Sequence, residues 1–137
     1  MKAISTAGLK NHQAELDGAM IRLEVERFTT LLSKAGIESV RVWCSYNPDL
    51  PDDSPFQSPE ATVPPESVMR FLNDAIRNNV WHFGDSWNRS GIEGVDGSFK
   101  FFLGNDKDIT LETVVMFLFD RTRTAWEKAG YEIAYHD

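Results

Sequence analysis

The stretch LLSKAGIESVRVWCSY, residues 31–46, marks a change from the hydrophobic period of a helix to that of a strand. Up to Ala35 the apolar residues follow helical spacing, which predicts a helix over about residues 13–35. Gly36 follows as a helix stop. From Val40 onward apolar and polar residues alternate, and this alternation predicts a strand with one apolar face.

Further helices and strands are predicted on both sides of this boundary. The patterns indicate helices at about 64–79 and 110–129, with Thr110 as the cap of the second, and strands at about 80–87, 99–103 and 131–135. Residues 88–97 hold three glycines and are predicted to be a turn. The order α-β-α-β-β-α-β predicts one two-layer α+β domain over residues 1–137, with about four strands in a mixed or antiparallel sheet and helices mainly on one face.

A long acidic, proline-rich loop is predicted at residues 48–65. All six prolines of the chain lie there, and proline is excluded from helix interiors and central strands. Loops of this length inside a compact domain are usually functional or disordered. The acidic residues within the loop are Asp49, Asp52, Asp53 and Glu60.

The net charge of −7 and the pI of about 4.9 narrow the classes of partner. Binding to nucleic-acid phosphates or to anionic lipid needs a basic surface, so we expect neither nucleic acid nor membrane as a partner. The negative electrostatic field of such a protein attracts a basic protein or a cationic ligand. The chain has a single cysteine, no signal-like apolar run near its start and no stretch approaching the ~20 apolar residues of a membrane span, so we expect a cytoplasmic protein.

Four tryptophans are many for a chain of this size, and most are expected in the core. Trp43 is the exception, because it lies on the polar face of its predicted strand, just before the acidic loop. An aromatic side chain ringed by carboxylates is typical of a protein interface. The predicted partner-binding residues are therefore Trp43, Trp81 and Trp87 together with Asp49, Asp52, Asp53 and Glu60.

A small-molecule pocket near His82, Asp85 and Glu93, with the proline-rich loop as its lid, is the alternative. On a regular strand His82 and Asp85 point to opposite faces, so a catalytic pair would need a bulge between them. A structural histidine is the ordinary explanation. No motif indicates a metal or a cofactor, and Cys44, on the apolar face of its strand, is expected to be a buried, unreactive thiol.

The leading hypothesis is a small acidic protein-binding module without catalytic activity. Its size, acidity and α+β layout are similar to those of small neutralising proteins such as bacterial immunity proteins, a resemblance in composition that carries no residues across. The alternatives are a binding domain or enzyme with the pocket described above, or a subunit that acts by self-association. The sequence does not fix the oligomeric state.

Overall fold

The structure is a computed structural model that describes residues 1–10, 15–44, 60–78, 90–103 and 108–136. Its elements form seven strands, three α-helices and a 3₁₀ turn, η2, within these residues. In chain order they are β1 (Lys2–Thr6), α1 (Gly18–Lys34), β2 (Val40–Cys44), β3 (Glu60–Val63), η2 (Pro65–Ser67), α2 (Val68–Arg77), β4 (Ser90–Gly94), β5 (Phe99–Leu103), β6 (Ile109–Thr113), α3 (Met116–Ala129) and β7 (Ala134–His136).

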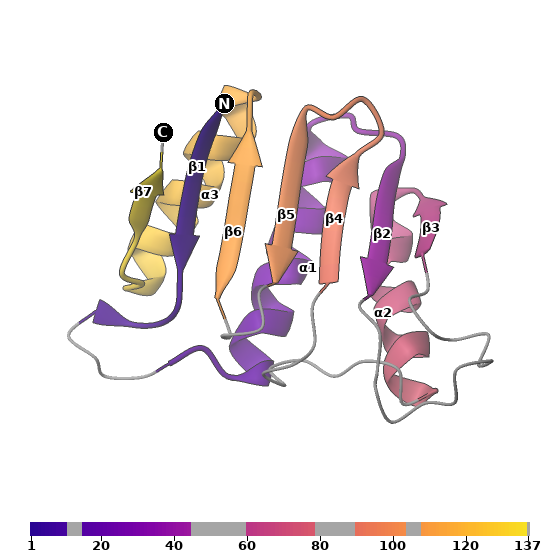
Figure 1. The fold of residues 1–137 in the computed structure, drawn as a ribbon, viewed down its shortest axis with the longest axis horizontal. Helices are drawn as coiled ribbons and strands as arrows, with labels where there is room; N and C mark the ends of the chain where they lie inside the picture. The colour runs from indigo at the N-terminus through magenta and orange to yellow at the C-terminus, as the bar shows by residue number, and fades with distance from the viewer. Residues whose placement is uncertain (11–14, 45–59, 79–89, 104–107, 137) are drawn as a thin grey trace.

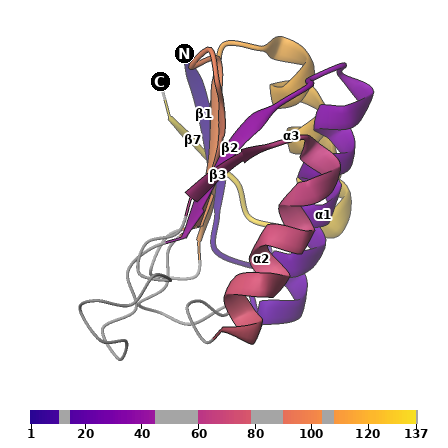
Figure 2. The same cartoon turned by 90° about the vertical axis from the view of Figure 1, so that its right-hand side faces the viewer.

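The seven strands form one antiparallel sheet in the order β3-β2-β4-β5-β6-β1-β7 (Figure 1). All three α-helices pack on the same face of this sheet, as the edge-on view in Figure 2 shows. The predicted α+β class and the placement of helices on one face are therefore confirmed. The opposite face, which we call the outer face, carries no helix among the described residues.

The core lies between the sheet and the helices, and in β2 and β5 it is built by alternation of buried and more exposed residues along the strand. In β5, Phe99 and Phe101 point toward the helices and are buried, while Lys100 and Phe102 lie on the outer face and are partly exposed. Phe28 of α1 stacks on Phe101 with ring centroids 4.3 Å apart and meets Phe99 edge-on at 5.8 Å. Burying one such ring contributes about 1.5–3 kcal/mol, so this aromatic cluster fixes α1 over the middle of the sheet.

Local signals set the ends of the helices where the sequence indicated them. Asp17 caps α1, because its carboxylate accepts a hydrogen bond from the Met20 amide at 2.8 Å. Gly36 follows the end of α1 with φ of +77°, and Gly130 ends α3 with φ of +80°. These left-handed conformations favour glycine, so both predicted helix stops are confirmed.

The predicted number of strands is wrong, because four strands, β1, β3, β4 and β6, were not predicted from the sequence patterns. Residues 110–113 were predicted as the start of a helix, yet they belong to β6 (Ile109–Thr113), which is paired with β5 on one side and β1 on the other. Thr110 is therefore a strand residue and not a cap. The continuous apolar run after it concealed the true helix start at Met116. Strand β1 is short and polar, with only two buried residues, and gave little signal of its own.

The turn predicted at 88–97 and the loop predicted at 48–65 also differ from the structure. Residues 90–94 form β4, whose two glycines resemble a turn in sequence. Residues 60–63 form β3 at the sheet edge, so the loop ends before Glu60, and Pro65 begins the 3₁₀ turn that leads into α2. Residues 48–59 and the strand predicted at 80–87 lie outside the described residues.

Candidate functional site

The outer face of the sheet brings together residues from β3, β2, β4 and β5. The strand register places Trp43 beside Glu60 and Gly91, and Arg41 beside Glu93. On the next strand Phe102 lies opposite Gly91, and Lys100 lies opposite Glu93. We call this group the outer-face cluster, and its members are Arg41, Trp43, Glu60, Gly91, Glu93, Lys100 and Phe102.

The Trp43 ring packs against Gly91, which has no side chain, and one hydrogen bond holds the ring there. A Cβ at Gly91 would lie only 2.5 Å from the Cε2 and Nε1 atoms of the Trp43 ring, so the indole occupies the space that a side chain would fill. Glycine inside a strand often marks such a close approach. The indole N–H donates to Oε1 of Glu93 at 3.1 Å. The ring is half-buried and fixed in orientation.

Arg41 lies between two carboxylates. Its Nη1 donates to Oε2 of Glu60 at 3.1 Å, and its Nη2 donates to Oε2 of Glu93. Partial burial acts to raise the pKa of Glu93, but the hydrogen bonds from Arg41 and Trp43 outweigh it and lower the pKa. Exposed ion pairs stabilise by about 0–1 kcal/mol, so these contacts orient side chains more than they hold the fold together.

Three of the predicted site residues, Trp43, Glu60 and Glu93, therefore come together on the outer face. Glu60 belongs to a strand, and its carboxylate has an internal partner in Arg41. The others lie outside the described residues, namely Asp49, Asp52, Asp53, Trp81, His82, Asp85 and Trp87. The three aspartates belong to the segment between Cys44, the last residue of β2, and Glu60, the first residue of β3. Glu60 pairs with Trp43 across the two strands.

Gly91, Lys100 and Phe102 were not predicted as site residues. The strand β4, which joins β5 to β2, was predicted from the sequence to be part of a turn. Alternation alone placed Arg41 and Trp43 on one face of a strand. The neighbours of that strand come from distant parts of the chain and have no local signal. Cys44 faces the helices and is buried, and burial raises the pKa of its thiol to about 12, so the predicted buried thiol is confirmed.

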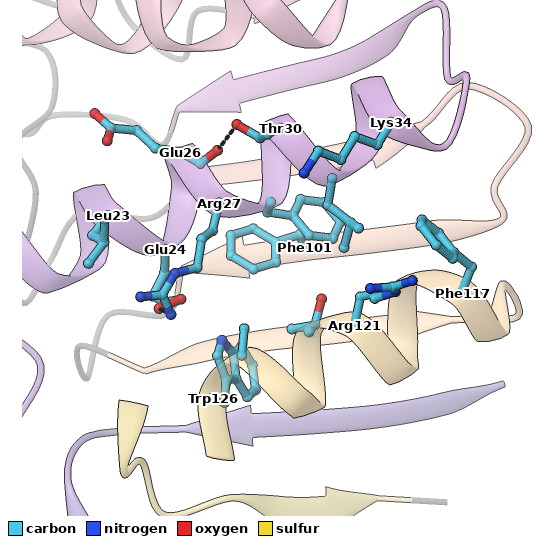
Figure 3. A pocket seen from close by; sticks show the side chains of 14 residues that line it. Leu23, Glu24, Glu26, Arg27, Thr30, Lys34, Phe101, Phe117, Arg121 and Trp126 are labelled. Atoms are coloured by element: carbon cyan, nitrogen blue, oxygen red, sulfur yellow. Dashed lines mark hydrogen bonds and ion pairs between the residues drawn. The ribbon is translucent and has the colours of Figure 1, made fainter. Parts of the chain in front are cut away.

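A groove of about 640 Å³ lies on the other side of the molecule, between α1 and α3 (Figure 3). We call it the α1–α3 groove. Phe101 of β5 forms part of its floor, and side chains of the two helices form its walls. Its walls include Glu24, Arg27 and Lys34 of α1 and Phe117, Arg121 and Trp126 of α3.

Glu24 is a buried carboxylate at one end of this groove, with only 2% of its surface exposed. Nη1 of Arg27 donates to its Oε1 at 2.8 Å, and the side chains of Tyr131 and Trp126 also hydrogen-bond to it. Burial raises the pKa of Glu24 and outweighs the opposing effect of these partners. The carboxylate thus has its donors inside the protein, which buried charges require.

Comparison of the chain with protein families, with curated proteins and with solved structures found no match. Within the described residues, no group of three or more histidine, cysteine, aspartate or glutamate side chains is arranged to hold a metal ion. No helix in the described part of the chain has the length and apolar character needed to cross a membrane.

The packing of Trp43 on Gly91 predicts a strong dependence between the two positions. Gly91→Ala should destabilise the protein by about 1–3 kcal/mol, because the new methyl group displaces the indole ring. In a Trp43→Ala background the same change should be neutral or stabilising, since alanine is better than glycine in a strand. Urea unfolding of the four proteins measures the coupling. Equal effects of Gly91→Ala in both backgrounds would show that the ring does not lie there.

The buried carboxylate predicts a specific pH dependence of stability. The pKa of Glu24 is higher in the folded protein than its ordinary value of 4.5 in the unfolded chain. Between these two values the folded state holds a proton that the unfolded state has lost, so the contribution of Glu24 to stability falls as pH rises through this window. The free energy of unfolding of the wild type relative to Glu24→Gln should therefore decrease as pH rises above about 4.5.

The measurement is urea unfolding at a series of pH values. Glu26→Gln is the matched control, because it removes one negative charge from the exposed side of the same helix. A wild-type-minus-Glu24→Gln difference that stays constant from pH 4 to pH 8 would contradict the prediction.

Proposed function

We propose that this protein is a small protein-binding module of the inhibitor or immunity type, which binds a basic surface of another protein through the outer-face cluster. The observation that carries the proposal is the position of Trp43. Its ring lies flat on the open side of the sheet, fixed by Gly91 and Glu93 and only half-buried.

A fixed aromatic ring suits protein recognition. Tryptophan and arginine are the residues most enriched among those that contribute most to binding energy at interfaces. Binding is also stronger when such side chains need not be ordered first, because less conformational entropy is lost. Trp43 is oriented by the Glu93 carboxylate, and Arg41 by Glu60 and Glu93, before any partner arrives.

The charges around Trp43 favour a basic partner. Glu60 and Glu93 share the guanidinium of Arg41, and Lys100 lies opposite Glu93, so the described cluster has no net charge of its own. The excess of negative charge comes from the neighbouring segment and from the chain as a whole. The segment that joins β2 to β3 adds Asp49, Asp52 and Asp53 next to it in the chain. Together with the net charge of −7, these groups would steer a cationic surface toward the sheet. As an inhibitor, the protein would place its carboxylates where the partner otherwise holds a phosphate or an acidic substrate.

The alternative pocket at His82, Asp85 and Glu93 has less support. Both carboxylate oxygens of Glu93 are already engaged, one by Trp43 and the other by Arg41. We therefore assign Glu93 the role of orienting its neighbours, Trp43 and Arg41.

Removal of the acidic charges in the β2–β3 segment tests the proposal. A triple variant with Asp49, Asp52 and Asp53 changed to asparagine is compared with the wild type in capture of partners from a lysate of the source organism. We expect basic proteins to be captured by the wild type, and the affinity of the purified partner to fall by about tenfold or more in the variant. Trp43→Ala should weaken the same partner by about 2 kcal/mol or more.

The matched control changes Glu15, Glu38 and Glu132 to glutamine, which removes the same number of charges from exposed positions elsewhere. This control should keep its affinity. A partner that binds the wild type and the asparagine variant equally well, or that is lost equally from both triple variants, would contradict the assignment of this face.

A further inference from the structure

We propose that the α1–α3 groove is a second binding site, for a small amphipathic acid with an apolar body and one carboxylate head group. This site lies on the helical side of the molecule, away from the outer-face cluster, so it goes beyond the function proposed above (Figures 2 and 3). Three features of the groove carry the inference, namely its apolar lining, two cations that have no ion-pair partner among the described residues, and an acidic group at the opposite end.

The lining is apolar and of suitable size. Phe101 and Phe28 contribute from below, and Leu23 and Phe117 line the two walls, where 46% and 40% of their surfaces remain exposed. Ligand sites are usually concave, about 300–1,000 Å³ in volume and mostly apolar, with a few placed polar groups. Exposed apolar side chains gathered in a groove mark such a site better than those scattered singly.

The two unpaired cations lie in the half of the groove that contains Phe117. Lys34 comes from the last turn of α1 and Arg121 from the facing α3 (Figure 3). Among the described residues neither forms an ion pair with a carboxylate, whereas the third cation of the groove, Arg27, is paired with Glu24. The Arg121 guanidinium lies 5.3 Å from the Phe117 ring centroid, which orients it at the groove. This is a cationic site in a chain of net charge −7, and it fits an anion.

The other end of the groove fixes the direction of the ligand. Glu24 lies there, buried, with Arg27, Tyr131 and Trp126 as its partners. A second carboxylate near it would be repelled, so the acid head group belongs at Lys34 and Arg121. Lys34 and Arg27 are seven residues apart on α1, which corresponds to about 10 Å along the helix. An apolar chain of that length would lie over Phe101 and end near Trp126.

The probes are decanoate and decanol, which share an apolar chain and differ in the acid group. Binding is measured by titration of backbone amide shifts by NMR, below the concentration at which decanoate forms micelles. We expect saturable binding of decanoate with shifts on both helices around the groove, at least tenfold tighter than that of decanol. Equal affinity for the two probes, or shifts spread over the outer face of the sheet, would overturn the proposal.

Two variants test the groove by independent means. Lys34→Gln combined with Arg121→Gln should remove the preference for decanoate over decanol, because it removes the head-group site. The matched control, Lys10→Gln combined with Lys128→Gln, removes two exposed positive charges outside the groove and should keep the preference. Loss of the preference in both double variants would show that only overall charge matters.

Ala125→Phe is the second test, because a larger side chain at this wall position fills the groove without changing charge. It should weaken decanoate by tenfold or more. Unchanged binding in this variant would place the ligand elsewhere and overturn the proposal. These outcomes leave the proposed partner-binding face untouched, because its test uses other residues and another ligand.

Discussion

The stack of Phe28 on Phe101 is the contact on which the rest of the structure depends. It joins the middle of α1 to the central strand β5, and Phe99 extends the same cluster along the strand. Because successive residues of a strand point to opposite faces, burying Phe101 under α1 commits Lys100 and Phe102 to the other side. The same rule, carried across seven paired strands, gives the sheet one face that packs on the helices and one that carries no helix among the described residues.

Each face then has its own chemistry. On the helical side, apolar packing leaves a groove with the buried Glu24 at one end and Lys34 and Arg121 at the other. On the outer side, Gly91 lets the Trp43 ring lie against the backbone, and charged neighbours fix its orientation. The exposed ion pairs on the outer side add little to stability. The groove and the outer-face cluster both hold polar groups in defined positions, and for this reason we infer that they are binding sites.

Much of the layer structure could be predicted from the sequence, and the strand pairing could not. The helical period before Gly36, the alternation at Val40 and the stop at Gly130 are local signals, and each was read correctly. β4 and β6 were missed because Gly91 and Gly94 resemble a turn, and because the apolar run after Thr110 resembles a buried helix. Their identity as strands depends on neighbours far away in the chain. For the same reason Trp43 could be placed on an outer face, whereas its contacts with Gly91 and Glu93 could not be foreseen.

The division of the sheet into two faces is tested most directly by a pair of substitutions at adjacent positions. Phe101→Ala and Phe102→Ala remove the same ring from opposite sides of β5, and urea unfolding measures the free energy that each change costs. Our account predicts a loss of about 3–5 kcal/mol for Phe101→Ala, because it leaves a cavity under α1, and a smaller loss for the partly exposed Phe102. Equal losses at the two positions would mean that both faces are buried, and would contradict the account.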